Sequence, residues 1–146
     1  MIADKLAEYT YDLRYDDLSE DVIHEVKRRF IDAIGCAIGS KNSIPVKIIK
    51  KFADSNLIPL KAFLYGTMIR YLDYNDSYIT KDLPHPSDNI GAVLAVSESL
   101  KSNGKEAILA TALAYELQCR LSDTASLREH GWDHVNYGLI LSLIHI

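Results

Sequence analysis

Four aspartates, one histidine and one arginine are crowded into the stretch from Arg70 to Gly91, which reads RYLDYNDSYITKDLPHPSDNIG. His85 stands between two prolines, and a residue before proline is driven out of the helical region, so we expect this imidazole on extended backbone. A carboxylate within hydrogen-bond reach of an imidazole orients and charges the ring, which makes an acid/base pair. The stretch therefore predicts proton-transfer chemistry at the edge of a cleft.

Three polar residues in this stretch, Asp73, Asp76 and Ser77, follow one another at positions i, i+3 and i+4. If the preceding helix continues through them, all three share one face. The alternative interpretation is that Asp, Asn and Ser at a helix end serve as solvated caps and turns. The spacing alone is compatible with both interpretations.

A pair of histidines, His130 and His134, lies four residues apart, a spacing that could hold zinc on a helix. Gly131 and Trp132 intervene, and the stretch follows a polar loop, so we expect neither a continuous helix nor a metal site here.

Three arginines, Arg70, Arg120 and Arg128, are the cations nearest to these candidates in the sequence. The planar guanidinium fork binds carboxylates through two parallel hydrogen bonds, so these side chains could hold a polycarboxylate. Ordinary salt bridges are the alternative, and the sequence does not rank the three.

The composition favours a single folded domain, residues 1–146, with 48% hydrophobic and 25% charged residues. The net charge of −4 and the scattered basic residues argue against nucleic acid and against a membrane surface as partners. Cys36 and Cys119 are far apart, which is neither a disulfide framework nor a zinc ribbon. With no signal peptide and no apolar run of roughly 18 residues, we expect a soluble cytoplasmic protein.

The elements that must position these residues all follow helical spacing. We expect helices at residues 2–13, 19–39, 43–52, 60–72, 87–104 and 105–123, and we find no alternating run typical of a strand. Ser19 is expected to cap the second helix and Gly39 to end it, with Ile34 and Ile38 on its buried face. The sixth helix carries Tyr115 on its apolar stripe. The fold class is therefore all-α, an irregular bundle of six to seven helices.

Several long blocks of this sequence resemble the MmgE/PrpD family, with the closest likeness to its 2-methylcitrate dehydratase members. These blocks are VKRRFIDAIGCAIGS, GTMIRYLDYNDSY, HPSDNIGAVLAVSE and ALAYELQCRLSDTASLREHGWDHVNYG. They occur in the family's order from about Leu18 to Gly138, which makes the resemblance specific. It implies a two-domain enzyme, with a helical domain and a smaller α/β lid, of which this chain is an N-terminal helical fragment.

The resemblance also implies the residues of a pocket. It assigns acid/base roles to Asp73, His85 and His134, and substrate binding to Ser77 and, more weakly, to Arg70. The family's pocket also uses basic residues from further along the chain. We therefore expect this chain alone to be at best a weak enzyme. The apolar ending LSLIHI does not resemble the family's continuation, and we interpret it as a foreign tail.

The implied reaction removes water from 2-methylcitrate to give 2-methyl-cis-aconitate, a step of propionate catabolism in the methylcitrate cycle. It needs a base, an acid and cations around a small tricarboxylate substrate, and it implies no metal and no other cofactor. Two other activities of the family remain as alternatives, cis-aconitate decarboxylase and iminodisuccinate epimerase. A catalytically inert helical fragment is the alternative from another class. We expect a homodimer for the full-length parent.

Overall fold

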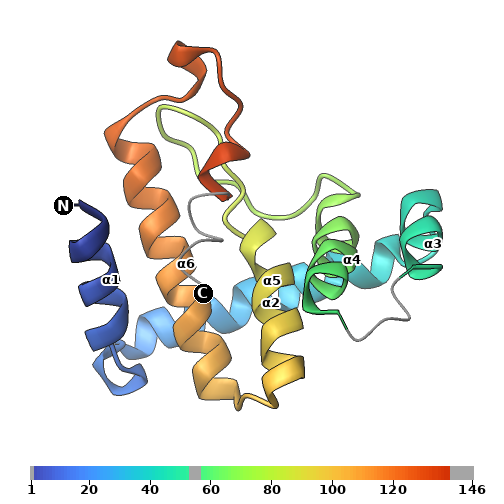
Figure 1. The fold of residues 1–146 in the computed structure, drawn as a ribbon, viewed down its shortest axis with the longest axis horizontal. Coiled ribbons are helices and arrows are strands. Elements are labelled where there is room, and N and C mark those ends of the chain that lie inside the picture. Colours follow the sequence, from blue (N-terminus) through green and yellow to red (C-terminus); the bar gives the residue numbers. More distant parts are fainter. Residues whose placement is uncertain (1, 53–56, 139–146) are drawn as a thin grey trace.

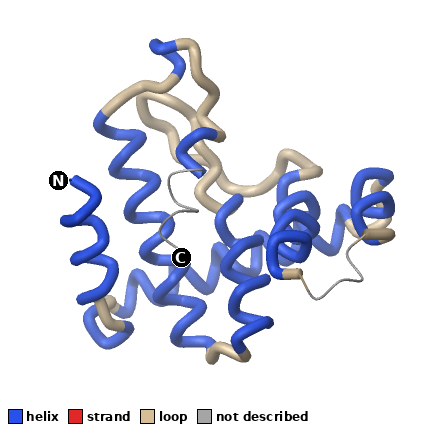
Figure 2. Tube along the Cα trace, viewed as in Figure 1, coloured by secondary structure: helices blue, strands red, loops and turns tan. Residues whose placement is uncertain are grey.

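A computed structural model describes residues 2–52 and 57–138, which form a bundle of helices (Figure 1). No strand occurs within these ranges (Figure 2), which confirms the all-α fold. The ending interpreted as a foreign tail lies outside the described residues. In chain order the elements are α1 (Ile2–Asp12), the 3-10 helix η1 (Tyr15–Asp17), α2 (Glu20–Ser40), α3 (Ile44–Lys50), α4 (Ile58–Arg70), α5 (Asp88–Leu100), α6 (Gly104–Thr124) and the 3-10 helix η2 (Arg128–His130).

Helix α2 crosses behind α6, α5 and α4 in the view of Figure 1. As predicted, Ser19 caps it, because the Ser19 hydroxyl accepts a hydrogen bond from the Val22 amide at 3.3 Å. The predicted stop at Gly39 is wrong, since α2 continues to Ser40. A Cβ atom on Gly39 would lie 2.9 Å from Leu72 Cδ1. This glycine of α2 therefore leaves room for the Leu72 side chain, which follows α4.

Helices α4 and α5 form the most extensive helix pair of the described chain. Gly91 accounts for their close approach. A Cβ atom on Gly91 would lie 2.6 Å from the backbone nitrogen of Gly66 and 2.8 Å from its Cα. The same crossing brings the last residue of α4, Arg70, to the first turn of α5.

The ends of α4 and α5 differ from the predicted ones. Helix α4 ends at Arg70, two residues before the predicted end. Helix α5 ends at Leu100, where Lys101 adopts a left-handed conformation with φ 54°. Asn103 does not end α5, because its side chain accepts hydrogen bonds from the first turn of α6 and forms a capping box with Glu106.

The centre of the bundle is a small cluster of Ala33, Ile69 and Ile90, one residue each from α2, α4 and α5. Ile34 and Ile38, predicted to widen the buried face of α2, are 44% and 58% exposed in the described chain. The buried stripe of α2 is therefore narrower than its apolar pattern indicates.

Two long connections lie side by side at one end of the bundle, residues 71–87 between α4 and α5 and residues 125–135 after α6 (Figure 1). The buried carboxylate of Asp82 joins them. It accepts hydrogen bonds from the Ser126 hydroxyl and the Leu127 amide at 2.8 Å each, and from the Tyr137 hydroxyl at 2.9 Å. This contact fixes the two segments that carry the candidate histidines relative to each other.

Candidate active site

The stretch after α4 is not helical. Asp73 has a positive φ of 51°, so the shared helical face considered for Asp73, Asp76 and Ser77 does not form. Instead, the side chain of Asn75 reaches the start of α5 and donates to the Ser87 hydroxyl at 2.8 Å. The segment after α4 thus folds back onto the residues that precede α5, and this brings its polar groups together.

His85 lies outside any helix, as its place before a proline predicts, and it is buried. Its Nδ1 lies 2.7 Å from the backbone carbonyl oxygen of Asp76. Because a carbonyl oxygen only accepts, Nδ1 must carry the hydrogen, and Nε2 of the neutral ring then holds the lone pair. An Nη2 group of Arg70 lies 3.3 Å from that Nε2 and donates to it.

His134, in the segment after η2, packs against His85. Its ring centroid lies 5.5 Å from that of His85, with the two planes at 63°, an edge-to-face contact. Its Nδ1 lies 2.6 Å from a carboxylate oxygen of Asp133. Its Nε2 is buried and has no hydrogen-bond partner in the part of the chain that the structure describes. The carboxylate therefore fixes the ring and leaves one nitrogen free for another group.

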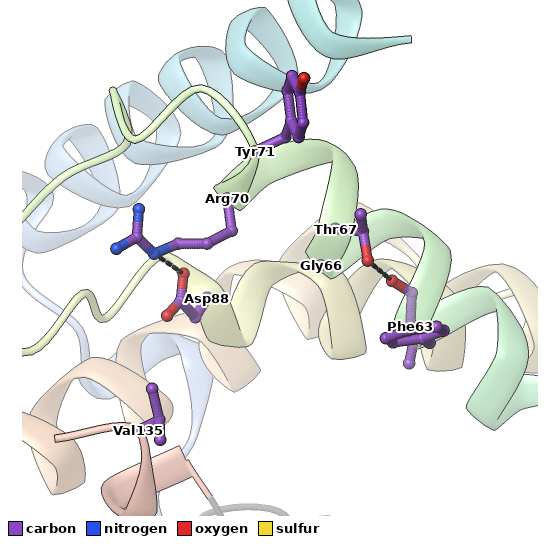
Figure 3. A pocket seen from close by; sticks show the side chains of 8 residues that line it. Phe63, Gly66, Thr67, Arg70, Tyr71, Asp88 and Val135 are labelled. Atoms are coloured by element: carbon purple, nitrogen blue, oxygen red, sulfur yellow. Dashed lines mark hydrogen bonds and ion pairs between the residues drawn. The ribbon is translucent and has the colours of Figure 1, made fainter. Parts of the chain in front are cut away.

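Arg70 connects His85 to two carboxylates. It pairs with Asp73 through Nη1, and its Nε lies 3.9 Å from a carboxylate oxygen of Asp88 (Figure 3). The hydrogen bond from Arg70 and its positive charge hold the pKa of Asp73 below its usual value. Asp73 therefore lies against Arg70, and neither histidine is its hydrogen-bond partner.

Asp88 is a member of this cluster that the sequence reasoning missed. Burial raises the pKa of its carboxyl above the usual value, although the charges of Arg70, His85 and His134 act in the opposite direction. Asn75 donates to it at 3.1 Å. Its place after Ser87 at a helix start was the available signal, but that pattern is typical of a simple cap.

A pocket of about 610 Å³ lies beside Arg70 and Asp88 (Figure 3). Val135, which directly follows His134 in the chain, also lines the pocket, and Arg70 joins the pocket to His85. The charged side chains of Arg70 and Asp88 lie together, and most of the other lining residues are apolar. The residues that line it are Ala62, Phe63, Gly66, Thr67, Arg70, Tyr71, Asp88 and Val135.

The remaining candidates lie elsewhere or alone. Ser77 is exposed and makes no hydrogen bond to the cluster within the described ranges. Gly131, with φ 77°, breaks the backbone between His130 and His134, so the two do not share a helical face. Arg120 pairs with Glu116 on the surface, and Arg128 is exposed in η2.

The described residues offer neither a metal cluster nor a membrane-spanning helix. No group of three His, Cys, Asp or Glu side chains there is arranged to hold a metal ion. Among the described helices, none combines the length and apolar character that a membrane span requires.

Comparison with known proteins gives one family match. Residues 4–143 match the MmgE/PrpD N-terminal domain. A probable 2-methylcitrate dehydratase of Saccharomyces cerevisiae is 31% identical over 73% of this chain and 26% of its own length. A 2-methylcitrate dehydratase-like protein of Aspergillus oryzae is 30% identical over 92% of the chain and 33% of its own length. The 2-methylcitrate dehydratase of Escherichia coli is 36% identical over 51% of the chain and 17% of its own length. The chain thus spans a third or less of the length of these relatives.

Proposed function

The chain belongs to the MmgE/PrpD family, and from this premise we propose that it is the N-terminal helical part of a hydro-lyase that dehydrates 2-methylcitrate. The observation that carries the proposal is the pair of histidines next to Arg70, an arginine that lines a pocket. His85 and His134 are in ring contact, and Arg70 donates to one of them. Relatives named 2-methylcitrate dehydratase support the choice of substrate.

Dehydration beside a carboxylate has three chemical demands. A base takes the proton from the carbon next to the carboxylate, the C–O bond to the hydroxyl breaks as the double bond forms, and an acid protonates the departing hydroxyl to give water. A cation must hold the carboxylate on which negative charge develops. Two imidazoles and one guanidinium meet these demands at neutral pH.

We assign the base to His134. Its Nε2 is buried and free of hydrogen-bond partners among the described residues, while Asp133 holds its Nδ1 at 2.6 Å. Both nitrogens of His85 are engaged, one by the Asp76 carbonyl and one by Arg70. His85 then serves as the acid. Once Arg70 has turned from its Nε2 toward a substrate carboxylate, this nitrogen takes up a proton from solvent and passes it to the departing hydroxyl, while Nδ1 keeps its hydrogen bond to the Asp76 carbonyl.

The pocket supports a small polyanion as substrate. Arg70 lines it, and the carboxylates that Arg70 now contacts, Asp73 and Asp88, mark the positions that substrate carboxylates would compete for. Asp73 is exposed, so it can yield this position at little cost in burial. Further cations for the other carboxylates belong, in this proposal, to the remainder of the full-length protein.

The test uses the full-length protein with three substrates, namely 2-methylcitrate, cis-aconitate and iminodisuccinate. We expect turnover of 2-methylcitrate, followed by the absorbance of the unsaturated product and confirmed by its mass. Release of CO₂ from cis-aconitate, or inversion of iminodisuccinate, without turnover of 2-methylcitrate would overturn the proposed reaction in favour of another activity of the family.

A further inference from the structure

The position of the His85 ring depends on the direction of one backbone carbonyl. Its Nδ1 donates to the carbonyl oxygen of Asp76 at 2.7 Å. Both residues lie in the connection 71–87, which has no helix to hold its peptide groups in place. Within this connection the Tyr78 amide donates to the Pro84 carbonyl at 2.9 Å, and the side chain of Asp76 provides the anchor nearest to the carbonyl that holds His85.

The Asp76 carboxylate is fixed to three different helical elements. It is only 6% exposed. One of its oxygens accepts from the Ser87 amide at the start of α5, at 3.0 Å. The other accepts from the Tyr115 hydroxyl of α6, at 2.6 Å, and lies 3.7 Å from Nη1 of Arg29 in α2.

A buried carboxylate is costly in a helical bundle unless every lone pair is satisfied. Here it is satisfied by two strong donors and a nearby guanidinium. Burial and the adjacent Asp76 charge raise the pKa of Tyr115 far above its usual value, so its hydroxyl keeps its proton and stays a donor. The contact is therefore rigid across the pH range in which a histidine titrates.

We propose that Asp76, anchored by Tyr115 and Arg29, is a positioning residue that holds His85 in its Nδ1–H tautomer with Nε2 directed at the substrate. This inference rests on the proposed function for its catalytic meaning, but its structural content is independent of the reaction. Neither Tyr115 nor Arg29 lines the pocket beside Arg70, so their effect on chemistry passes through Asp76 and His85.

The first experiment reads the His85 tautomer directly, by ¹⁵N NMR of the histidine side chains of this chain at a pH where the ring is neutral. We expect the Nδ1–H tautomer in the unaltered chain and a loss of that population in Tyr115→Phe and Asp76→Ala. The matched control is Tyr65→Phe, which removes a comparable tyrosine–carboxylate bond, to Glu98 at 2.7 Å, away from the histidines.

Circular dichroism establishes that each variant is folded. If Asp76→Ala is not folded, Tyr115→Phe decides the question, because it removes one hydroxyl and keeps the ring. An unchanged His85 tautomer in folded Tyr115→Phe would overturn the inference, whatever the activity of the protein.

The second experiment measures kinetics in the full-length protein. We expect Tyr115→Phe to lower kcat by about 10-fold to 10²-fold with little change in KM, since misplacing a catalytic group by about 1 Å costs rate and leaves binding intact. Tyr65→Phe should leave both constants unchanged. If the unaltered protein does not turn over 2-methylcitrate, the proposed function fails, while the NMR result still decides the role of Asp76.

Discussion

The imidazole rings of His85 and His134 meet edge to face, 5.5 Å apart between centroids, although helices α5 and α6 separate the two residues in the chain. The contact places two groups that can each give or take a proton next to each other. A dehydration needs two such groups, one acid and one base.

Replacing either ring tests this pairing. We expect His85→Gln and His134→Gln each to lower kcat of the full-length protein by about 10²–10⁴-fold, the usual contribution of a positioned acid or base. The double variant should lose little more than the weaker single variant, because the two rings act as a unit. His24→Gln, on the exposed face of α2, is the control. Fully multiplicative losses would contradict a shared step.

Arg70 should act mainly on substrate binding. A lysine in its place keeps the positive charge but loses the planar fork that can reach two oxygens at once. We expect Arg70→Lys to raise KM by about 10- to 10²-fold, since a hydrogen bond to a charged group is worth about 1.5–3 kcal/mol. Steady-state kinetics measures the change. Arg120→Lys, at an exposed ion pair with Glu116, should leave KM unaltered. An equal effect of both substitutions would remove Arg70 from the binding site.

Asp82 should make stability depend on acid pH. Burial tends to raise the pKa of Asp82, but the hydrogen bonds from Ser126, Leu127 and Tyr137 outweigh it and hold the pKa below the usual value. Its contribution is therefore complete above the unfolded pKa of about 3.9, and is lost as pH falls through the folded value.

Urea unfolding of Asp82→Asn measures this contribution. An amide presents its own donors to three converging donors, so the variant should be less stable at pH 7 and lose less further stability in acid. Asp12→Asn, at an exposed position, is the control. Parallel stability curves for the Asp82 variant and the unaltered chain would refute the assignment.

Asp88 should show the opposite pH dependence. Burial raises its pKa in the folded chain, so the folded state binds the proton more tightly than the unfolded state does. Stability then falls as pH rises from about 3.9 through the raised folded value, and stays reduced above it. Asp88→Asn removes this penalty and can still accept from Asn75. We expect a flatter stability curve between acid and neutral pH, measured by the same urea series; a steeper one would contradict the burial argument.

Sequence reasoning located the two histidines in different ways. A local rule applies to His85, because Pro86 keeps it out of the helix, whereas His134 was identified through the resemblance to the MmgE/PrpD family. Sequence reasoning could not find the roles of Asp76 or Asp88, because these depend on which helices pack around a carboxylate. Nor could it distinguish a glycine that ends a helix from one that admits a neighbour, and for this reason it misassigned Gly39.

The crossing of α4 and α5 is the contact on which the site geometry depends most. A Cβ atom on Gly91 would lie 2.6 Å from the backbone nitrogen of Gly66, and a backbone cannot turn aside as a flexible side chain can. Gly91→Ala must therefore push the two helices apart. We expect the free energy of unfolding to fall by about 1–3 kcal/mol or more, the cost of overpacking a tight contact.

Gly66→Ala provides the matched control, because a Cβ atom there would meet nothing within 4 Å. It should be neutral or stabilising by up to about 1 kcal/mol, since alanine favours a helix interior over glycine. Thermal unfolding of both variants gives the comparison. The Nε of Arg70 lies 3.9 Å from a carboxylate oxygen of Asp88, and separation of the helices would lengthen this distance. Gly91→Ala should thus weaken substrate binding in the full-length protein. In the thermal unfolding experiment, equal melting temperatures for Gly91→Ala and Gly66→Ala would show that the crossing is looser than the structure indicates.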